Sequence, residues 1–359
     1  MARHCWIGTR KGLIKVAQAN DQSWSLSPPN FAGEPVTCVL PADSLGVMYA
    51  ALNLGHFGPK LHRSRDGGRS WEECTAPAFP KSGKEADEAK SVNLIWIMEY
   101  GANGALLAGT VPAGLFRSND QGDSWEFLQS LNNMPGSTEW FGGGFDEPGL
   151  HSIQVDSRDQ QRLTIAISCG GVWYSEDNGG NWVNKAQGMR AEYLPPEQAG
   201  NVNSQDPHRL LSCPADQDRL WVQHHNGIFR FDESAGTWQE IENVKPSGFG
   251  FALAVHPTDK DAAWFVPAIK DECRIPVDNR LVVNRTRDGG KSFEALGEGL
   301  PQEHSYDLIY RHCLEVDEDG ETLMMGSTSG NLWASPNAGD NWSCLATNLA
   351  DVYCVRFGH

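Results

Sequence analysis

The stretch Ser64-Arg65-Asp66-Gly67-Gly68-Arg69-Ser70-Trp71 carries the pattern S/T-x-D-x-G-x-x-W/F, which returns along the whole chain. Further copies begin at Ser118, Ser175, Thr286 and, more loosely, Ser335. Eroded copies at residues 20–24 and 232–238 fill the remaining gaps. The spacing of the closing aromatic residues is about fifty residues, which indicates a repeat architecture. These aromatic residues are Trp24, Trp71, Trp125, Trp182, Trp238, Phe293 and Trp342.

Each copy has the composition of a tight turn between two strands. Glycine adopts positive φ without steric cost, and an Asp side chain can accept a hydrogen bond from the backbone two residues on. The flanking residues alternate as strands do, for example over 114–118 before one turn and 125–128 after it. We therefore expect the Ser/Thr and Asp of each copy to satisfy backbone groups, and these aspartates to be structural rather than catalytic.

The pattern resembles the Asp-box, or BNR, repeat of sialidases and related β-propellers, and the resemblance covers nearly the whole chain. It implies an all-β propeller in which each box joins the third and fourth strands of a blade, on the face away from the usual active site. It does not imply a true sialidase. The segment Cys273-Arg274-Ile275-Pro276 looks like the Arg-Ile-Pro motif of that family, but it lies late in the chain instead of ahead of the first box. No arginine triad or tyrosine–glutamate pair can be assigned, and sialidase propellers have six blades.

The strands between the boxes predict a seven-bladed β-propeller with four-stranded blades, formed as a single domain over residues 1–359. The N-terminal segment supplies only three strands, whereas residues 352–357 have strand character and no box after them. We expect the N- and C-terminal strands to pair and close the ring, which leaves no open sheet edge. The predicted blades span residues 1–27 plus 350–359, 36–74, 91–128, 150–185, 207–241, 250–296 and 307–346.

The composition narrows the classes of partner. A formal net charge of −17 argues against nucleic acid and against an anionic membrane surface, because both would be repelled. Residues 1–8 lack the apolar region of a signal peptide, and no apolar run is long enough to span a bilayer. The nine cysteines form no C-x-x-C pair, which is typical of reduced thiols in a cytoplasmic protein.

Histidines give the first candidate site. His151, His208 and His312 are predicted to open the innermost strands of blades four, five and seven, and so to converge on an axial pocket. Three neutral imidazoles with an open position for water are a ligand set that zinc prefers. These three residues are therefore candidate ligands of one divalent metal, with zinc the first choice. Because they lack the local spacing of a zinc motif, binding or acid–base chemistry without a metal, and a purely structural role, stay open.

Carboxylates and a fourth histidine lie close to these candidates in sequence. Glu147 and Asp206 are candidates to orient the imidazole rings or to act as a base. His225 is predicted to end the second strand of blade five and to approach the same rim. We take Glu147, Asp206 and His225 as the catalytic candidates.

Arginines and one aromatic residue are the candidates for ligand binding. Arg209 and Arg311 adjoin two of the histidines, and Arg274 lies in an insertion over residues 268–280. Guanidinium groups suit a carboxylate or phosphate through forked hydrogen bonds. Trp140 belongs to the aromatic and glycine-rich segment 139–149, which is expected to form an ordered loop over a pocket.

Two functions follow as alternatives. The first is a hydrolase or lyase acting on a small anionic or carbohydrate-like ligand in the His/Arg pocket, with or without a metal; it predicts histidines gathered around one pocket. The second is a non-catalytic propeller that binds a protein partner through its loop face, as similar seven-bladed Asp-box proteins do as assembly factors or sorting receptors. It predicts a broad apolar face. A glycoside hydrolase would in addition need two carboxylates facing each other.

Overall fold

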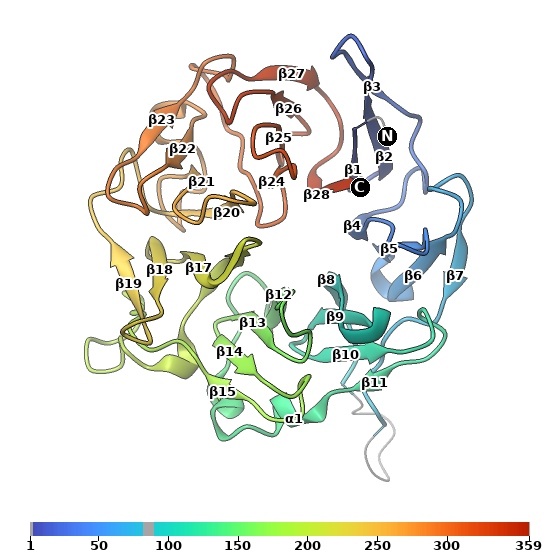
Figure 1. Ribbon diagram of the computed structural model, residues 1–359, viewed down its shortest axis with the longest axis vertical. Helices are drawn as coiled ribbons and strands as arrows, with labels where there is room; N and C mark the ends of the chain where they lie inside the picture. Colours follow the sequence, from blue (N-terminus) through green and yellow to red (C-terminus); the bar gives the residue numbers. More distant parts are fainter. Residues whose placement is uncertain (1–2, 82–89, 359) are drawn as a thin grey trace. The chain divides into compact units, whose positions relative to one another are not determined.

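The computed structural model describes residues 3–81 and 90–358. They form seven four-stranded antiparallel sheets with almost no helix, so the predicted class, a seven-bladed β-propeller, is confirmed (Figure 1). The chain divides into two compact units. One unit holds blades two to four (residues 34–186 and 202–206), and the other holds blades one, five, six and seven. The assignment of the whole chain to one domain stays a prediction.

Blade one is built from both ends of the chain, as predicted. Its strand order is β28 (Val352–Gly358), β1 (His4–Thr9), β2 (Gly12–Gln18) and β3 (Trp24–Leu26). β28 runs antiparallel to β1, with His4 opposite Gly358 at one end and Thr9 opposite Val352 at the other. Pairing of the two termini therefore supplies the innermost strand of this blade.

The same unit contains blades five to seven, in which the strands follow one another from the inside outward. Blade five consists of β16 (Pro207–Cys213), β17 (Asp216–His224), β18 (Ile228–Asp232) and β19 (Thr237–Ile241). Blade six consists of β20 (Gly250–Val255), β21 (Ala263–Pro267), β22 (Val283–Thr286) and β23 (Glu294–Leu296). Blade seven consists of β24 (Leu314–Val316), β25 (Leu323–Gly326), β26 (Leu332–Ser335) and β27 (Ser343–Ala346).

The other unit holds three blades of the same design. Blade two consists of β4 (Val36–Leu40), β5 (Met48–Asn53), β6 (Pro59–Ser64) and β7 (Glu72–Cys74). Blade three consists of β8 (Leu94–Tyr100), β9 (Leu106–Val111), β10 (Leu115–Ser118) and β11 (Glu126–Phe127). Blade four consists of β12 (Gly149–Val155), β13 (Leu163–Ser168), β14 (Gly171–Ser175) and β15 (Val183–Asn184). One short helix, α1 (Gln129–Asn132), lies between blades three and four in the chain, and 3₁₀ turns cover Gly55–Phe57, Ala102–Gly104, Pro135–Glu139, Val202–Ser204 and Val277–Asn279.

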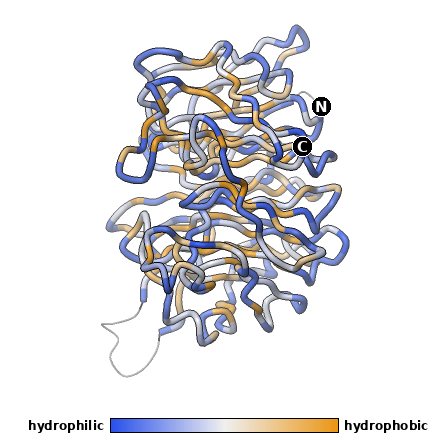
Figure 2. The backbone as a smooth tube through the Cα atoms, turned by 90° about the vertical axis from the view of Figure 1, so that its left-hand side faces the viewer, coloured by the Kyte–Doolittle hydropathy of each residue, from blue (hydrophilic) through white to orange (hydrophobic). Residues whose placement is uncertain are grey.

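Apolar residues are concentrated in the strands and hydrophilic residues in the turns (Figure 2). The apolar side chains of the strands make up most of the buried core. Four tryptophans are among the largest fully buried side chains: Trp173, Trp221, Trp264 and Trp333. Large aromatic rings contribute much of the burial that holds such sheets together. Among the described residues, no helix is long and apolar enough to cross a membrane.

The repeated turn has the structure that the sequence predicts. Ser64 Oγ accepts a hydrogen bond from Gly68 N at 2.9 Å and donates one to Asp66 Oδ1 at 2.9 Å. Asp66 in turn accepts bonds from the backbone and the hydroxyl of Ser70 at 2.9 and 2.6 Å. Equivalent bonds recur in the turns that begin at Ser118, Ser175 and Thr286, and Asn337 takes the place of the Asp in the last copy. Each Asp thus accepts hydrogen bonds from groups within its own turn and stabilises it.

A second repeated contact joins neighbouring blades and was not predicted. The residue just before the box position is an arginine in blades two, three, five and six, and it donates to a carbonyl in the box turn of the next blade. Arg63 reaches Gln121 O at 2.9 Å and Arg285 reaches Ala338 O at 2.8 Å. The other two pairs are Arg117 with Asn178 O and Arg230 with Gly289 O. All four carbonyls belong to residues with φ between 55° and 71°, at the same position of the turn. We call these four contacts the arginine latches.

The box aspartates make acid stability a test of the turn. Hydrogen bonds from Ser124 lower the pKa of Asp120 from 3.8 to about 2, and Ser292 lowers that of Asp288 from 3.8 to about 2. Because the folded pKa is the lower one, the stabilisation is complete above pH 4 and is lost as the pH falls from about 4 to about 2. Urea unfolding measured across this range should show a smaller loss of stability in the Asp120→Asn, Asp288→Asn double variant than in the wild type.

The copy with Asn337 provides the matched control for this prediction. It makes the same turn with an amide that does not titrate, since Ser335 Oγ donates to Asn337 Oδ1 at 3.0 Å. Asn337→Asp should therefore steepen the acid dependence of the unfolding free energy. A pH dependence unchanged in both variants would show that these turns do not set acid stability.

One strand prediction needs correction. The innermost strand of blade seven is only Leu314–Val316, so His312 lies in the turn before β24 rather than within the strand. The preceding segment forms turns that are tied by Cys313 N donating to Tyr310 O at 3.1 Å, and this tight link shortens the strand.

Candidate metal centre

The innermost strands of blades two to five share a β-bulge near their start. The pairing of each innermost strand with the second strand of its blade shifts register near its start. The residue skipped is Thr37, Trp96, His151 or His208. A bulge leaves one residue outside the ladder and re-aims its side chain. His151 and His208 therefore occupy equivalent positions, as predicted, whereas His312 precedes its strand.

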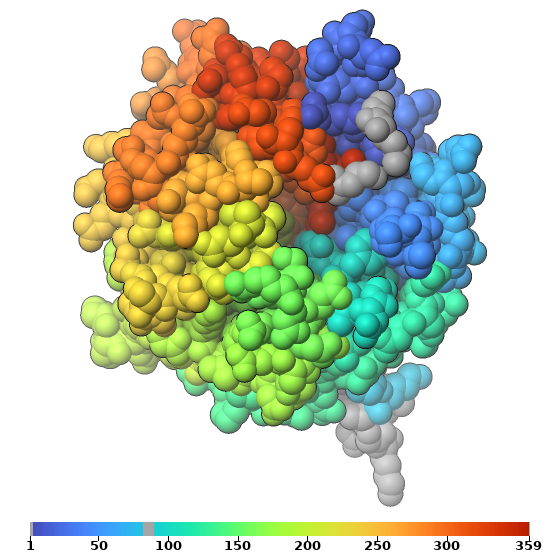
Figure 3. Space-filling model, viewed as in Figure 1, coloured from blue at the N-terminus to red at the C-terminus, as the bar shows by residue number. Residues whose placement is uncertain are grey.

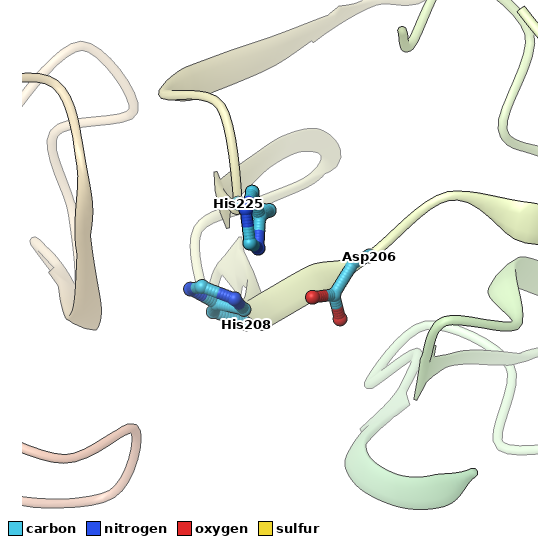
Figure 4. A group of neighbouring side chains, drawn as sticks. All are labelled: Asp206, His208 and His225. Atoms are coloured by element: carbon cyan, nitrogen blue, oxygen red, sulfur yellow. The ribbon is translucent and has the colours of Figure 1, made fainter. Parts of the chain in front are cut away.

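Three side chains at the start of blade five gather into one group, Asp206, His208 and His225 (Figure 4). Each offers one ligand atom, and these atoms lie within 4.8 Å of one another. The group is local in the chain: Asp206 directly precedes β16, His208 lies on β16, and His225 directly follows β17, the strand that pairs with β16. In Figure 4 the carboxylate of Asp206 faces the two imidazole rings.

The tautomer of His208 is set by the backbone of blade six. Its Nδ1 lies 2.7 Å from Gly250 O, and a carbonyl oxygen only accepts hydrogen bonds, so the proton is on Nδ1. The lone pair is then on Nε2, which is the ligand atom that this tautomer offers. A backbone carbonyl that holds the other ring nitrogen is the usual outer-shell partner of a metal-binding histidine.

One oxygen of Asp206 is fixed in the same way. Asp206 Oδ1 accepts hydrogen bonds from Ser168 Oγ at 3.0 Å and from Cys169 N at 3.1 Å. The Asp206 residue is 4% exposed, so these bonds compensate part of the cost of burying a carboxylate. Two donors therefore hold Oδ1, and with it the orientation of the carboxylate.

Two imidazoles and one carboxylate are a recognised donor set for Zn²⁺ or Fe²⁺ centres that keep positions open for water or substrate. The group contains His208, a predicted metal ligand, together with Asp206 and His225, which were predicted as catalytic residues. The shared metal site of His151, His208 and His312 stays a prediction.

Arginines lie close to this group through a shared aromatic ring. Phe251 stacks on His208 with ring centroids 4.4 Å apart and an angle of 12°. The guanidinium carbons of Arg274 and Arg311 lie 5.3 and 5.2 Å from the centroid of the same Phe251 ring. The structure therefore brings two predicted ligand-binding arginines and His208 together. Blades five and six, yellow and orange in Figure 3, adjoin on the face shown.

Arg274 is oriented by its own loop. Asp271 Oδ1 accepts hydrogen bonds from Arg274 Nε at 3.0 Å and from its NH2 group at 2.5 Å. The insertion that carries both residues is tied to the next link, since Ser305 N donates to Asn279 O at 3.0 Å. Arg311 is nearly buried, with 8% of the residue exposed. A charge held in place by a neighbouring acid is better prepared for a ligand than a flexible one.

The ring of a tyrosine packs edge-on against the ring of His225. The Tyr193 ring meets the His225 ring at 4.9 Å and 72°, and Tyr193 is 37% exposed. Its loop is held by Asn226, which accepts from Glu192 N at 3.1 Å and donates to Arg190 O at 2.8 Å. Tyr193 was not predicted, because a tyrosine in a long link has no distinguishing sequence signal.

The remaining predicted residues are not members of this group. His151 is fully buried, with Nδ1 3.0 Å from Ser152 Oγ and its ring edge-on to Trp96 at 5.4 Å. Glu147 accepts from Asn93 Nδ2 at 3.3 Å.

Two predicted ligand-binding residues and the last histidine complete the set. The Trp140 ring packs edge-on against Trp173 at 5.8 Å, with its Nε1 buried in the interior of blade four. Arg209 lies on β16 and is 8% exposed, and the carbonyl of His312 accepts from Val355 N at 2.8 Å. The ligand and catalytic roles of these residues stay predictions.

Comparison with known proteins adds to the fold but gives no family. No protein-family model matches this chain, and no curated protein matches it. Among solved structures, a GH74 xyloglucanase from Xanthomonas campestris matches over 95% of this chain at 17% identity, with a TM-score of 0.64. This chain covers 52% of that enzyme, about half its length.

Two further solved structures match most of their own length. A putative 6-phosphogluconolactonase from Bacteroides uniformis matches over 99% of both chains at 12% identity, with a TM-score of 0.61. YCF48 bound to D1 peptide matches over 86% of this chain and 80% of its own at 13% identity, with a TM-score of 0.56. At these identities the likeness shows the fold alone.

Proposed function

We propose that this protein is a metal-dependent hydrolase or lyase whose substrate is a small anionic, carbohydrate-like molecule. The single observation that carries the proposal is the group of Asp206, His208 and His225 within 4.8 Å of one another. The Nδ1 proton of His208 and the two donors to Asp206 Oδ1 support it, because such partners orient metal ligands.

Each residue has a defined task in this proposal. His208 Nε2, a ring nitrogen of His225 and Asp206 Oδ2 bind the cation. A divalent ion in such a site supplies a nucleophilic water at neutral pH and polarises an oxygen of the substrate. Arg274 and Arg311 bind the anionic group of the substrate, and Phe251 holds their guanidinium groups beside His208.

The charge balance favours an anion. The chain as a whole carries a formal charge of −17, yet Arg274 and Arg311 gather around Phe251 beside His208, and with a divalent cation bound these charges outweigh the carboxylates of Asp206 and Asp271. A local positive region in an acidic protein attracts a negatively charged ligand. Two solved structures with this fold are named as a xyloglucanase and a putative lactonase, which supports carbohydrate chemistry as a class.

A second candidate is a non-catalytic propeller that binds a protein partner. It is favoured by exposed aromatic side chains in the loop after blade three, where Phe141 and Phe145 are 37% and 44% exposed. YCF48, another propeller, is bound to a peptide in its structure. The cation site has no purpose in this alternative, so metal binding separates the two.

Two further proposals concern the class of propeller and its compartment. We assign the chain to the Asp-box propellers, on the support of the hydrogen bonds that recur in its box turns. We also place it in the cytoplasm, supported by nine cysteines that are all free thiols, two of them with pKa values raised well above the ordinary value by burial.

The test is the metal content of protein purified without a histidine tag, measured by elemental mass spectrometry. We expect close to one zinc or other transition-metal ion per chain. Asp206→Asn and His225→Ala should each weaken metal binding by more than the roughly 10–100-fold that loss of an outer-shell partner costs. The metal-loaded protein is then assayed with acidic lactones and esters, and turnover must disappear with the metal.

His304→Asn is the matched control, since His304 is exposed and adopts φ 55°, a conformation that Asn tolerates. It should keep the full metal content. Metal-free wild-type protein that binds no zinc when titrated would rule out the metal-dependent enzyme and leave the protein-binding alternative.

A further inference from the structure

One turn of blade four donates two hydrogen bonds to the carboxylate of Asp206. Ser168 ends β13, and the following residue, Cys169, donates its backbone N–H to the same oxygen that the Ser168 hydroxyl binds. Ser168, Cys169 and Asp206 are 2%, 3% and 4% exposed. Both donors are therefore shielded from water, where a hydrogen bond to a charged group contributes more than it does at the surface.

Cys169 adopts a conformation that side chains usually avoid. Its φ is 49°, in the left-handed region, although the residue is not glycine. Such backbone strain persists where the surroundings demand the conformation. In this conformation the backbone N–H of Cys169 donates its hydrogen bond to Asp206.

The loop over residues 139–149 packs against the turn at Ser168 and Cys169 and is anchored at both ends. Phe141 N donates to Cys169 O at 3.3 Å, and Ala113 N donates to Pro148 O at 2.7 Å. Near the second anchor, the ring of Phe145 packs edge-on against Trp96 at 5.0 Å. Between the anchors the chain runs through three consecutive glycines, 142–144.

Gly143, the middle one of the three, lies directly against Cys169 and Ser168. A Cβ on Gly143 would be 2.8 Å from Cys169 Sγ, 3.1 Å from Ser168 Oγ and 3.7 Å from Asp206 Oδ2. A contact of 2.8 Å is closer than real Cβ atoms approach, and the buried Cys169 has little room to yield. Gly144, the next residue, faces open space, with nothing within 4 Å of its Cβ position.

We propose that Ser168, the Cys169 amide and Gly143 are positioning elements for the metal centre. The two donors hold Asp206 Oδ1 and thereby keep the carboxylate turned toward the histidines, and the missing side chain at residue 143 lets the loop close over the carboxylate. This inference rests on the proposed function, since it takes Asp206 as a metal ligand. It names residues that act through Asp206 and do not themselves touch the metal or substrate.

The test is calorimetric titration of metal-stripped protein with Zn²⁺. Gly143→Ala and Ser168→Ala should each weaken zinc binding about 10–100-fold, the range for outer-shell partners. Gly144→Ala, one residue away and facing open space, should bind zinc like the wild type. Thermal unfolding of the metal-free proteins should show Gly143→Ala less stable than Gly144→Ala, because its methyl group crowds Cys169. Ser168→Ala adds no atoms, so its loss of zinc affinity reports the positioning of Asp206 without that crowding.

A second substitution tests the route of the Gly143 effect. Cys169→Gly keeps the N–H donor, suits φ 49° and removes the Sγ atom that the new methyl group would meet. The double variant Gly143→Ala, Cys169→Gly should therefore recover most of the zinc affinity lost in Gly143→Ala. The absorption spectrum of the Co²⁺-loaded proteins, which reports the ligand geometry, should change in Gly143→Ala and return in the double variant.

The outcomes separate the two proposals. Tight zinc binding by the wild type with equally tight binding by Gly143→Ala and Ser168→Ala would overturn this inference and leave the proposed function in place. Failure of the wild type to bind zinc would overturn both.

Discussion

A chain that ends at Asp351 is expected to lose the fold of the unit that holds blades one, five, six and seven, because the deletion removes β28, the innermost strand of blade one. Val352, Val355 and Phe357 are at most 2% exposed and belong to the largest buried cluster of their unit. At about 1.5–3 kcal/mol for each buried side chain, their loss costs about 5–9 kcal/mol. A domain of this kind is stable by only about 5–15 kcal/mol, and the deletion also leaves β1 as an open sheet edge. Circular dichroism during heating should show that the cooperative transition of this unit is lost.

Addition of the missing strand provides the control for this truncation. A synthetic peptide of residues 350–358 should restore a cooperative transition, since its backbone can pair with β1 as β28 does. Arg356→Ala in the full-length chain tests a partly exposed position of the same strand, where the side chain is 16% exposed, and should cost far less. A truncated chain that melts at the wild-type temperature would contradict the role of β28.

Trp264→Ala is expected to cost about 3–5 kcal/mol of unfolding free energy, the range for removing a large aromatic side chain from a core. Trp264 lies on β21, is 1% exposed and packs within the same cluster as Trp333 and Leu314. Its Nε1 donates to Ala338 O at 2.8 Å, in the box turn of blade seven. Urea unfolding monitored by circular dichroism measures the difference.

Trp264→Phe separates packing from hydrogen bonding. It keeps most of the ring and removes the donor, but Arg285 NH1 also donates to Ala338 O at 2.8 Å, so the carbonyl keeps a partner. We expect a loss of about 1–2 kcal/mol, near that of one hydrogen bond with a small change in volume. Equal losses in Trp264→Ala and Trp264→Phe would mean that the indole N–H, rather than packing, makes the larger contribution.

The fold was predictable because its signal is local and repeated. Ser, Asp, Gly and Trp stand at fixed spacing in each box, and each spacing corresponds to hydrogen bonds within one turn, such as Ser64 with Asp66. The strand at residues 352–357 was recognisable because it had no box after it. The arginine latches escaped prediction, although Arg63, Arg117 and Arg285 precede three boxes at the same position. Their partners lie in the next blade, where spacing along the chain gives no guide.

The candidate site was predictable only in part, because it depends on contacts between distant residues. Asp206, His208 and His225 could be named from their residue types and from the expected strand ends, but the sequence could not divide the ligand and catalytic roles among them. In the proposed metal centre, that division rests on the Gly250 carbonyl beside His208 and the Ser168 hydroxyl on Asp206. These partners lie about forty residues from the side chains they bind, and no motif marks them.

The arginine latches link six of the seven blades into two sets of three. Among the described residues they join blade two to three, three to four, five to six and six to seven. Blade four has Tyr174 at the arginine position and blade seven has Ala334, so the series stops at both places. Neighbouring repeats gain stability from their shared contacts. A set of three blades, rather than a single blade, is then the smallest part expected to open in one step, and also the smallest part that could be duplicated or exchanged with its contacts intact.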